Sequence, residues 1–235
     1  MKRFYKEVSV EPAASGWRVL LDGRGIKTAG RRDQIVPTRA LAAAMAQEWA
    51  DQGEELDTAR FVLRDLADYA IDVVAPAREQ AIRELLPYAE TDTLCYRGED
   101  GEPLHQRQVE VWEPLLTAAE QRWDVHFERV GGVIHRSQPA ETLARMEGVL
   151  AAESDFNLAT LRNLSSLAAS LVIALAAIAP EADAEALWNA ANLEEDWQAE
   201  LWGKDAEAEA RRERRFAGFA AAMRFAELAQ EEPGG

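Results

Sequence analysis

The stretch DFNLATLRNLSSLAASLVIALAAI, residues 155–178, decides how the larger part of this chain folds. Its apolar residues recur every three or four positions, which predicts a helix buried along one face, with Asp155 as the N-cap. They are Leu158, Leu161, Leu164, Leu167, Leu171, Leu175 and Ile178. The most apolar part, residues 167–179, is shorter than the roughly 20 residues that a bilayer span needs. We therefore expect one long core helix, and no membrane insertion.

The first part of the chain has a different pattern. Residues 3–10, RFYKEVSV, are rich in aromatic and β-branched side chains, and residues 17–28, WRVLLDGRGIKT, contain two short runs joined by Asp22 and Gly23. An Asp-Gly pair between such runs is a strong signal for a hairpin. The sequence therefore predicts a small β-rich region at the N-terminus.

The period of the apolar residues changes after Pro37. Leu41, Met45 and Trp49 follow at intervals of four behind Thr38, a suitable N-cap, which predicts a helix. The fold class that we predict is α+β, with a small N-terminal β-rich domain containing one helix, residues 1–55, and a larger all-helical C-terminal domain, residues 56–235. Further helices are expected at 61–74, 77–89, 108–123 with a kink or a new start at Pro114, 183–202 and 205–230, and a strand at 125–134.

Charge and composition exclude several functions. The formal net charge is −16, and residues 1–40 carry +5 while the remainder carries −21. Such a chain is repelled by nucleic acid and by anionic membranes. We find no glycine loop for a nucleotide and no metal-binding spacing of His or Cys, so we expect no cofactor, no metal and no small-molecule substrate. The single cysteine and the absence of a targeting pattern favour a bacterial cytoplasm, or the mitochondrial matrix for a mature eukaryotic form.

The segment YAETDTLCYR, residues 88–97, is the place where an active site could lie. In one interpretation Cys95 is a nucleophile, activated by Arg97 or a histidine, with Glu90 or Asp92 orienting the activating group. In the other, Cys95 is a buried core residue and Asp92 caps a turn. We favour the second, because no histidine is close in sequence.

The segment NLEEDWQAELWG, residues 192–203, is the best candidate for a contact surface. On a continuous helix Trp188, Glu195 and Trp202 are seven residues apart and lie close to one line. The opposite stripe, expected in the core, contains Ala186, Ala190, Leu193, Trp197 and Leu201. Two tryptophans flanking an acid suit a partner surface. Equally, the helix could be packed on both sides, with Glu195 paired to an arginine of residues 211–215.

Several motifs together resemble one family. In order along the chain they are KRFYKEVSV, LDGRGIKT, VPTRALAAAMAQEWADQ, ETDTLCYR, QVEVWEPLL and LEEDWQAELWG. This series is similar to the Atp12 family of ATP synthase F1 assembly chaperones from about Lys2 to Gly203, beyond which the resemblance ends. The resemblance implies a β-containing N-terminal domain, a helical C-terminal domain, and no enzymatic activity.

The resemblance also implies partner-binding positions. The acidic position characteristic of the family falls at Glu194 or Glu195, with Gln198 and Trp202 completing the motif, and Glu48 with Trp49 matches a position in the first helix. The helical stripe favours Glu195 and adds Trp188. The implied function is to hold the unassembled F1 α subunit and mask its β-facing surface until β displaces the chaperone. The alternatives are an enzyme of another type that uses Cys95, and a structural partner in some other complex.

Overall fold

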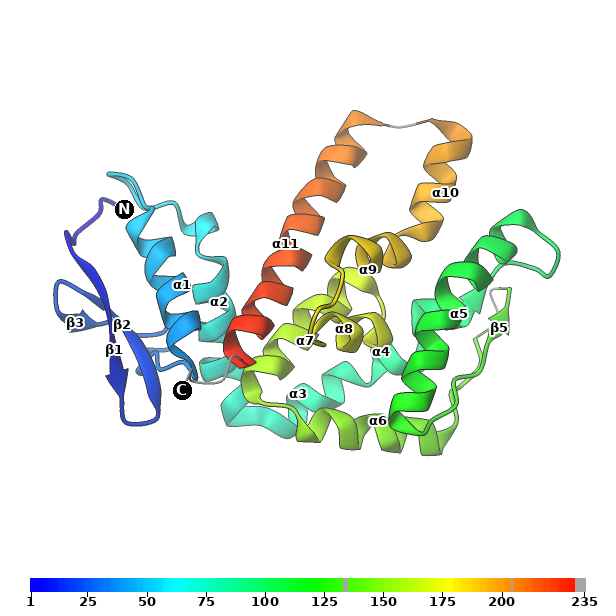
Figure 1. Cartoon of the computed structure of the whole chain (residues 1–235), viewed down its shortest axis with the longest axis horizontal. Coiled ribbons are helices and arrows are strands. Elements are labelled where there is room, and N and C mark those ends of the chain that lie inside the picture. Colours follow the sequence, from blue (N-terminus) through cyan, green and yellow to red (C-terminus); the bar gives the residue numbers. More distant parts are fainter. Residues whose placement is uncertain (133–134, 204, 231–235) are drawn as a thin grey trace. The chain divides into compact units, whose positions relative to one another are not determined.

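The N-terminal sheet begins the fold. A computed structural model describes residues 1–132, 135–203 and 205–230. Strands β1 (Val8–Ala13), β2 (Gly16–Leu21) and β3 (Arg24–Gly25) form an antiparallel sheet in that order (Figure 1). The predicted turn at Asp22 and Gly23 is confirmed, since both have positive φ, 49° and 76°. The Asp22 carboxylate also accepts hydrogen bonds from the backbone N–H groups of Lys6 and Glu7, at 3.0 and 2.8 Å.

The helix predicted from the spacing behind Thr38 is confirmed as α1 (Arg39–Ala50), and it packs on the sheet. Thr38 caps it by accepting a hydrogen bond from the Leu41 N–H at 3.1 Å. Leu41, Met45 and Trp49 are all buried. One apolar stripe with a period of four therefore faces the sheet.

The chain then continues as helix. A 3₁₀ turn (Thr58–Arg60) leads into α2 (Val62–Tyr69). Two N–H groups of its first turn, from Leu63 and Arg64, donate to the Glu48 carboxylate at 2.7 and 3.0 Å. A π turn (Ala70–Val74) and a 3₁₀ turn (Ala75–Ala77) connect α2 to α3 (Arg78–Leu85).

Packing divides the chain into two compact units. The N-terminal unit contains Met1–Arg78, Ser154–Thr160 and the end of the last helix from Ala221. The helical unit contains Glu79–Glu153 and Leu161–Ala220. The division differs from the predicted boundary near residue 55, because α2 packs against α1 and so belongs to the first unit.

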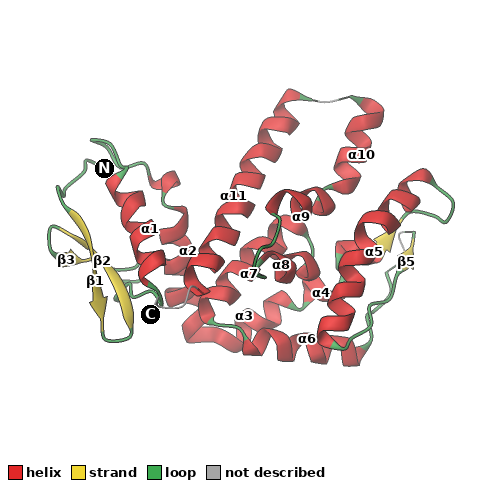
Figure 2. Cartoon of the chain, in the orientation of Figure 1, coloured by secondary structure: helices red, strands yellow, loops and turns green. Residues whose placement is uncertain are grey.

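Helices dominate the rest of the chain, and Figure 2 shows that strands are few there. The elements are α4 (Pro87–Glu90), a 3₁₀ turn (Thr93–Cys95), β4 (Tyr96–Arg97), α5 (Pro103–Trp123), β5 (Val130–Gly131), α6 (Ala140–Ala152), α7 (Asp155–Ala168), α8 (Leu171–Ala177), α9 (Ala184–Ala191), α10 (Leu193–Trp202) and α11 (Ala206–Gln230). The α+β class is confirmed. None of the described helices has the length and apolar character to cross a bilayer.

The C-terminal part is not entirely helical. Strands β4 and β5 pair in parallel, Tyr96 opposite Val130. The strand expected at 125–134 is therefore found only at Val130–Gly131 among the described residues, and residues 133 and 134 lie outside them. Helix α5 continues through Pro114 without a new start.

The long core helix predicted for residues 155–178 is wrong as a single helix. It breaks after Ala168, because Ala169 has a positive φ of 49° and Ser170 begins α8. The Ser170 hydroxyl caps α8 by accepting from the Ile173 N–H at 3.0 Å. Ser154, not Asp155, supplies the cap of α7, through a 3.0 Å hydrogen bond from the Asn157 N–H. The leucines of the stretch are nevertheless buried, apart from the half-buried Leu167.

Candidate protein-binding groove

An open groove of about 740 Å³ lies in the helical unit, between α10 and the start of α11. The buried Trp112 of α5 fixes the end of α9 beside it, since its indole N–H donates to the Ala190 carbonyl at 2.8 Å. The residues that line the groove include Arg107 from α5, Asn189 from α9, Glu195 and Gln198 from α10, and Arg212 and Arg215 from α11.

The acids of α10 have different environments. Glu194 accepts a hydrogen bond from the buried Gln108 at 2.7 Å, and the oxygen of that amide accepts from the Gly98 N–H at 2.8 Å. Asp196 accepts from Arg212, and Glu200 from Arg107, each at 2.7 Å. These three carboxylates hold α10 to its neighbours.

Glu195 is the least engaged acid of α10. Among the residues that the structure describes, its ion-pair partner is Arg215, at 3.7 Å, and its side chain is 64% exposed. Arg215 has other partners, because it donates to the Leu167 carbonyl at 2.9 Å and lies over the Trp188 ring, 5.3 Å from its centre. Glu195 thus has the internal arginine partner that one interpretation required, but that contact is weak.

The predicted line through Trp188, Glu195 and Trp202 is wrong. Trp188 is buried, with its ring 5.4 Å from that of Phe219 and 6.0 Å from that of Phe216. The helix stops at Ala191, and Asn192, with φ −109° and ψ 17°, starts a separate helix, so heptad spacing does not carry across. Ala186 and Leu201, both expected in the core, are exposed.

The end of α10 is apolar and exposed. Trp202 is 86% exposed and Leu201 is 62% exposed, while Gln198 is exposed one turn earlier. Gly203 ends the helix with a φ of 94°. Of the six predicted partner-binding residues, Glu195 and Gln198 thus line the groove and Trp202 lies beyond it on the same helix.

Trp49, the sixth of these residues, lies in the core of the N-terminal unit. Its ring is 5.5 Å from that of Tyr5 and 4.4 Å from that of Phe61, and the Tyr5 hydroxyl donates to its carbonyl at 2.6 Å. Its neighbour Glu48 caps α2. The resemblance identified a motif position here, but it could not distinguish a core residue from a contact residue.

The YAETDTLCYR segment is a structural element of the core. Cys95 is fully buried, and burial, together with the nearby Asp92 carboxylate, raises the pKa of its thiol far above the ordinary value. Asp92 caps the turn as expected, accepting from the Leu94 N–H at 3.1 Å. Arg97 donates to Glu113 at 2.6 Å. A buried thiol with a raised pKa is a poor nucleophile, which disfavours the interpretation of Cys95 as catalytic.

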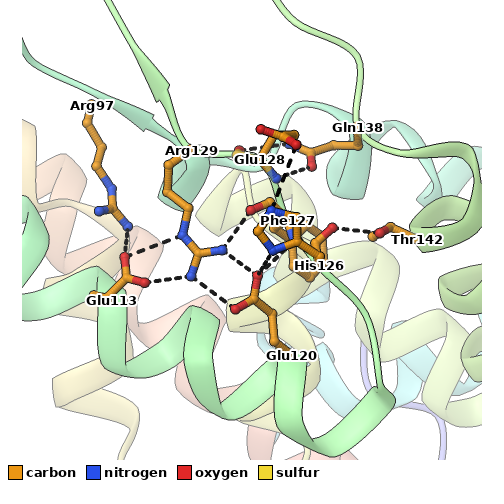
Figure 3. Close-up of polar contacts among 9 residues, drawn as sticks. All are labelled: Arg97, Glu113, Glu120, His126, Phe127, Glu128, Arg129, Gln138 and Thr142. Atoms are coloured by element: carbon orange, nitrogen blue, oxygen red, sulfur yellow. Dashed lines mark hydrogen bonds and ion pairs between the residues drawn. The ribbon is translucent and has the colours of Figure 1, made fainter.

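A charged cluster that sequence analysis missed connects β4 and β5 to α5 (Figure 3). Arg129 donates to Glu113 at 2.6 Å and also to Glu120, and Glu113 is shared with Arg97. The hydrogen bond from Arg129 contributes most to lowering the pKa of Glu113. These partners are 9 to 16 residues apart without a common period, so the sequence carried no signal for the cluster.

Two further observations define the site. Within residues 1–132, 135–203 and 205–230, no group of His, Cys, Asp and Glu side chains is placed to hold a metal ion. The groove is open and lined by both signs of charge, with exposed apolar residues on the same helix. Mixed polar and apolar surfaces of this kind are typical of proteins that bind other proteins.

Comparison with known proteins identifies the family. The model of the family described as "ATP12 chaperone protein" matches residues 2–120, just over half of the chain. The chain therefore belongs to the ATP12 chaperone family. Protein atp12, mitochondrial, from Schizosaccharomyces pombe is 24% identical over 214 residues, which are 86% of this chain and 74% of that protein.

Solved structures agree with this assignment. Atp12 from Paracoccus denitrificans is 34% identical and superposes with a TM-score of 0.92, covering 97% of this chain and 98% of that one. An aspartate-to-lysine mutant of that protein gives the same values. The two-part architecture is thus the fold of the family.

Proposed function

We propose that this chain is an assembly chaperone for the F1 sector of ATP synthase that binds the unassembled α subunit and masks its β-facing surface. Membership of the ATP12 family supports the role in F1 assembly. The observation that supports a contact surface on α10 is the weakly engaged carboxylate of Glu195, in the groove, on the helix that ends in the exposed Trp202. We place the protein in the bacterial cytoplasm, or in the mitochondrial matrix for a mature eukaryotic form.

Recognition by Glu195 would require little rearrangement. An exposed ion pair contributes at most about 1 kcal/mol, and at 3.7 Å the contact with Arg215 belongs to this class. A basic side chain of the α subunit can therefore replace Arg215 beside Glu195. Arg215 keeps its bond to the Leu167 carbonyl and its place over Trp188.

Apolar contact would come from the end of α10. An isolated α subunit exposes the surface that β covers in the assembled enzyme, and such patches drive aggregation. Trp202 and Leu201 offer exposed apolar area to it, and tryptophan is enriched among residues that dominate binding energy. Glu195 adds direction through a charge-assisted hydrogen bond.

Release needs no nucleotide in this scheme. The β subunit competes for the same surface of α, and a larger obligate interface displaces a smaller transient one. The net charge of −16 opposes self-association of the complex while α is held.

The experiment is capture of freshly synthesised α subunit by tagged variants of this chain. Glu195→Lys should abolish capture while the circular dichroism spectrum and the Tm stay those of the parent chain. Glu147→Lys is the matched control, because Glu147 is exposed on α6 of the same unit and undergoes the same charge change. Equal capture by folded Glu195→Lys would reject Glu195 as the anchor.

A further inference from the structure

Helix α10, which carries Glu195 and Trp202, has little apolar packing to hold it in place. Leu193 is its only buried residue among residues 193–202, all of which the structure describes. Most helices in proteins are held by an apolar face packed on the core. The direction of α10, and with it the positions of Glu195 and Trp202, therefore depends on polar contacts to neighbouring helices.

These polar contacts differ in burial. Arg107 of α5 donates to Glu200, and Arg212 of α11 donates to Asp196, each at 2.7 Å. The two arginine side chains are 39% and 32% exposed, and ion pairs in contact with water contribute little. Gln108 of α5, in contrast, is fully buried. Its contact to α10 is therefore the polar contact with the most buried donor.

The side-chain amide of Gln108 uses both of its ends. Its Nε2 group donates to Glu194 at 2.7 Å, and its oxygen accepts from the Gly98 N–H at 2.8 Å. A hydrogen bond between an amide and a carboxylate is stronger than one between two neutral groups. Gln108 thus joins the first turn of α10 to the segment that follows β4.

A second donor lies one turn further along α5. The indole N–H of Trp112 donates to the Ala190 carbonyl at 2.8 Å, near the end of α9. Gln108 and Trp112 are four residues apart and so lie on one face of α5. The two donors therefore hold the chain on both sides of the helix boundary at Asn192, Trp112 before it and Gln108 after it.

We propose that Gln108 is a positioning residue for binding of the α subunit, and that it acts through Glu194. In this arrangement Glu194 serves as a hydrogen-bond acceptor for Gln108, whereas Glu195 serves as a charge for the partner. An amide oxygen can replace the carboxylate of Glu194, but it cannot replace that of Glu195. The inference rests on the proposed function, because capture of the α subunit is one of its readouts.

The first test neutralises the two adjacent acids separately. Glu194→Gln and Glu195→Gln each remove one negative charge from the first turn of α10, so their effects on the helix dipole are matched. Glu194→Gln keeps an acceptor for Gln108 and should raise the Kd for freshly made α subunit less than about threefold. Glu195→Gln should raise it about tenfold. Equal losses in the two variants would overturn the proposal.

The second test removes the positioning contact itself. Gln108→Met and Glu194→Met should each raise the Kd about tenfold, because α10 then spends less time in the binding orientation. The double variant should bind as the single variants do, since both changes break the same hydrogen bond. Additive losses in the double variant would contradict action through Glu194.

Gln138→Met is the matched control for a merely structural effect. Gln138 is also buried in the helical unit, and its amide accepts from the Glu128 N–H at 2.8 Å and donates to the Glu128 carbonyl at 3.2 Å. Gln138→Met should lower the Tm and leave the Kd for the α subunit within about twofold of the parent value. Equal losses of capture in Gln108→Met and Gln138→Met would overturn the proposal.

Hydrogen exchange gives a readout that needs no partner. In the full chain, Gln108→Met and Glu194→Met should accelerate amide exchange in residues 193–202 about fivefold or more, while Glu194→Gln should not. Unchanged exchange in Gln108→Met would reject the positioning role. If the parent chain captures no α subunit, the proposed function fails; if it captures α and Gln108→Met captures it equally well, only the inference about Gln108 fails.

Discussion

The carboxylate of Asp92 accepts a 3.0 Å hydrogen bond from the backbone N–H of Val172, 80 residues away in the chain. The other oxygen of the same carboxylate accepts from the Leu94 N–H. Next to it, Thr93 donates its N–H and its hydroxyl to the Ala169 carbonyl, at 3.1 and 2.8 Å. The ETDT part of the segment at residues 88–97 therefore fixes the break between α7 and α8.

Asp92 should give the stability of the chain a measurable pH dependence. Burial raises the pKa of Asp92 from its ordinary 3.8 to about 6, so the folded chain binds this proton more tightly than the unfolded chain. This proton contributes on the order of 3 kcal/mol to the free energy of unfolding below about pH 4, and the contribution is lost as the pH rises through 6. In urea unfolding from pH 4.5 to 7.5, the parent chain should lose stability relative to Asp92→Asn. A constant difference between them would contradict the assignment.

Cys95 should be unreactive in the folded chain. It is fully buried and the pKa of its thiol is raised, so hardly any thiolate forms at pH 7.5. Iodoacetamide should label the native protein far more slowly than the same protein in 8 M urea, as followed by mass spectrometry. Rapid labelling of native protein would restore the interpretation of Cys95 as a catalytic nucleophile.

Trp188 and Trp202, which heptad spacing predicts on one line, should have opposite effects on stability and binding when substituted. Trp188→Ala should lower the free energy of unfolding by about 3–5 kcal/mol, because it opens a cavity beside Phe216 and Phe219. Trp202→Ala should change it by less than about 0.5 kcal/mol, since that side chain is 86% exposed, but it should weaken capture of the α subunit. Urea unfolding and the capture assay separate these effects. A stability loss at Trp202 equal to that at Trp188 would contradict the structure.

The charged cluster should matter for folding. Arg129→Ala leaves Glu113 and Glu120 without their shared cation and should cost roughly 3 kcal/mol, since Arg129 and Glu120 are about four-fifths buried. Adding Glu120→Gln should recover part of that loss. Arg136→Ala, at an exposed arginine, is the control and should stay within about 0.5 kcal/mol of the parent. Equal effects of Arg129→Ala and Arg136→Ala would show that the cluster contributes nothing.

Local signals explain what the sequence could predict of the fold. Thr38, Leu41 and Met45 determine α1 through a cap and a stripe within one helix, and the Asp22-Gly23 turn needs only its own two residues. Periodicity does not predict the helix breaks at Ala169 and Asn192, because the apolar residues keep their helical spacing across both. At Ala169 the break depends on Asp92 and Thr93, partners that no local pattern reveals.

The candidate site was predictable only in part. Resemblance and spacing identified the acids at the start of α10. They could not distinguish Glu194 from Glu195, because that distinction depends on the hydrogen bond from Gln108, 86 residues from Glu194. Trp188 and Trp202 have similar sequence surroundings and opposite exposure, because a helix boundary lies between them. Tertiary contacts that fix such boundaries are not encoded in periodicity.

The most direct measurement of the central claim is capture of F1 subunits without nucleotide. Freshly made α subunit and β subunit are offered separately to the immobilised chain, and β is then added to the α complex. The account predicts that α alone is captured and that β releases it. Capture of β in preference to α, or failure of the folded chain to bind α at all, would contradict it.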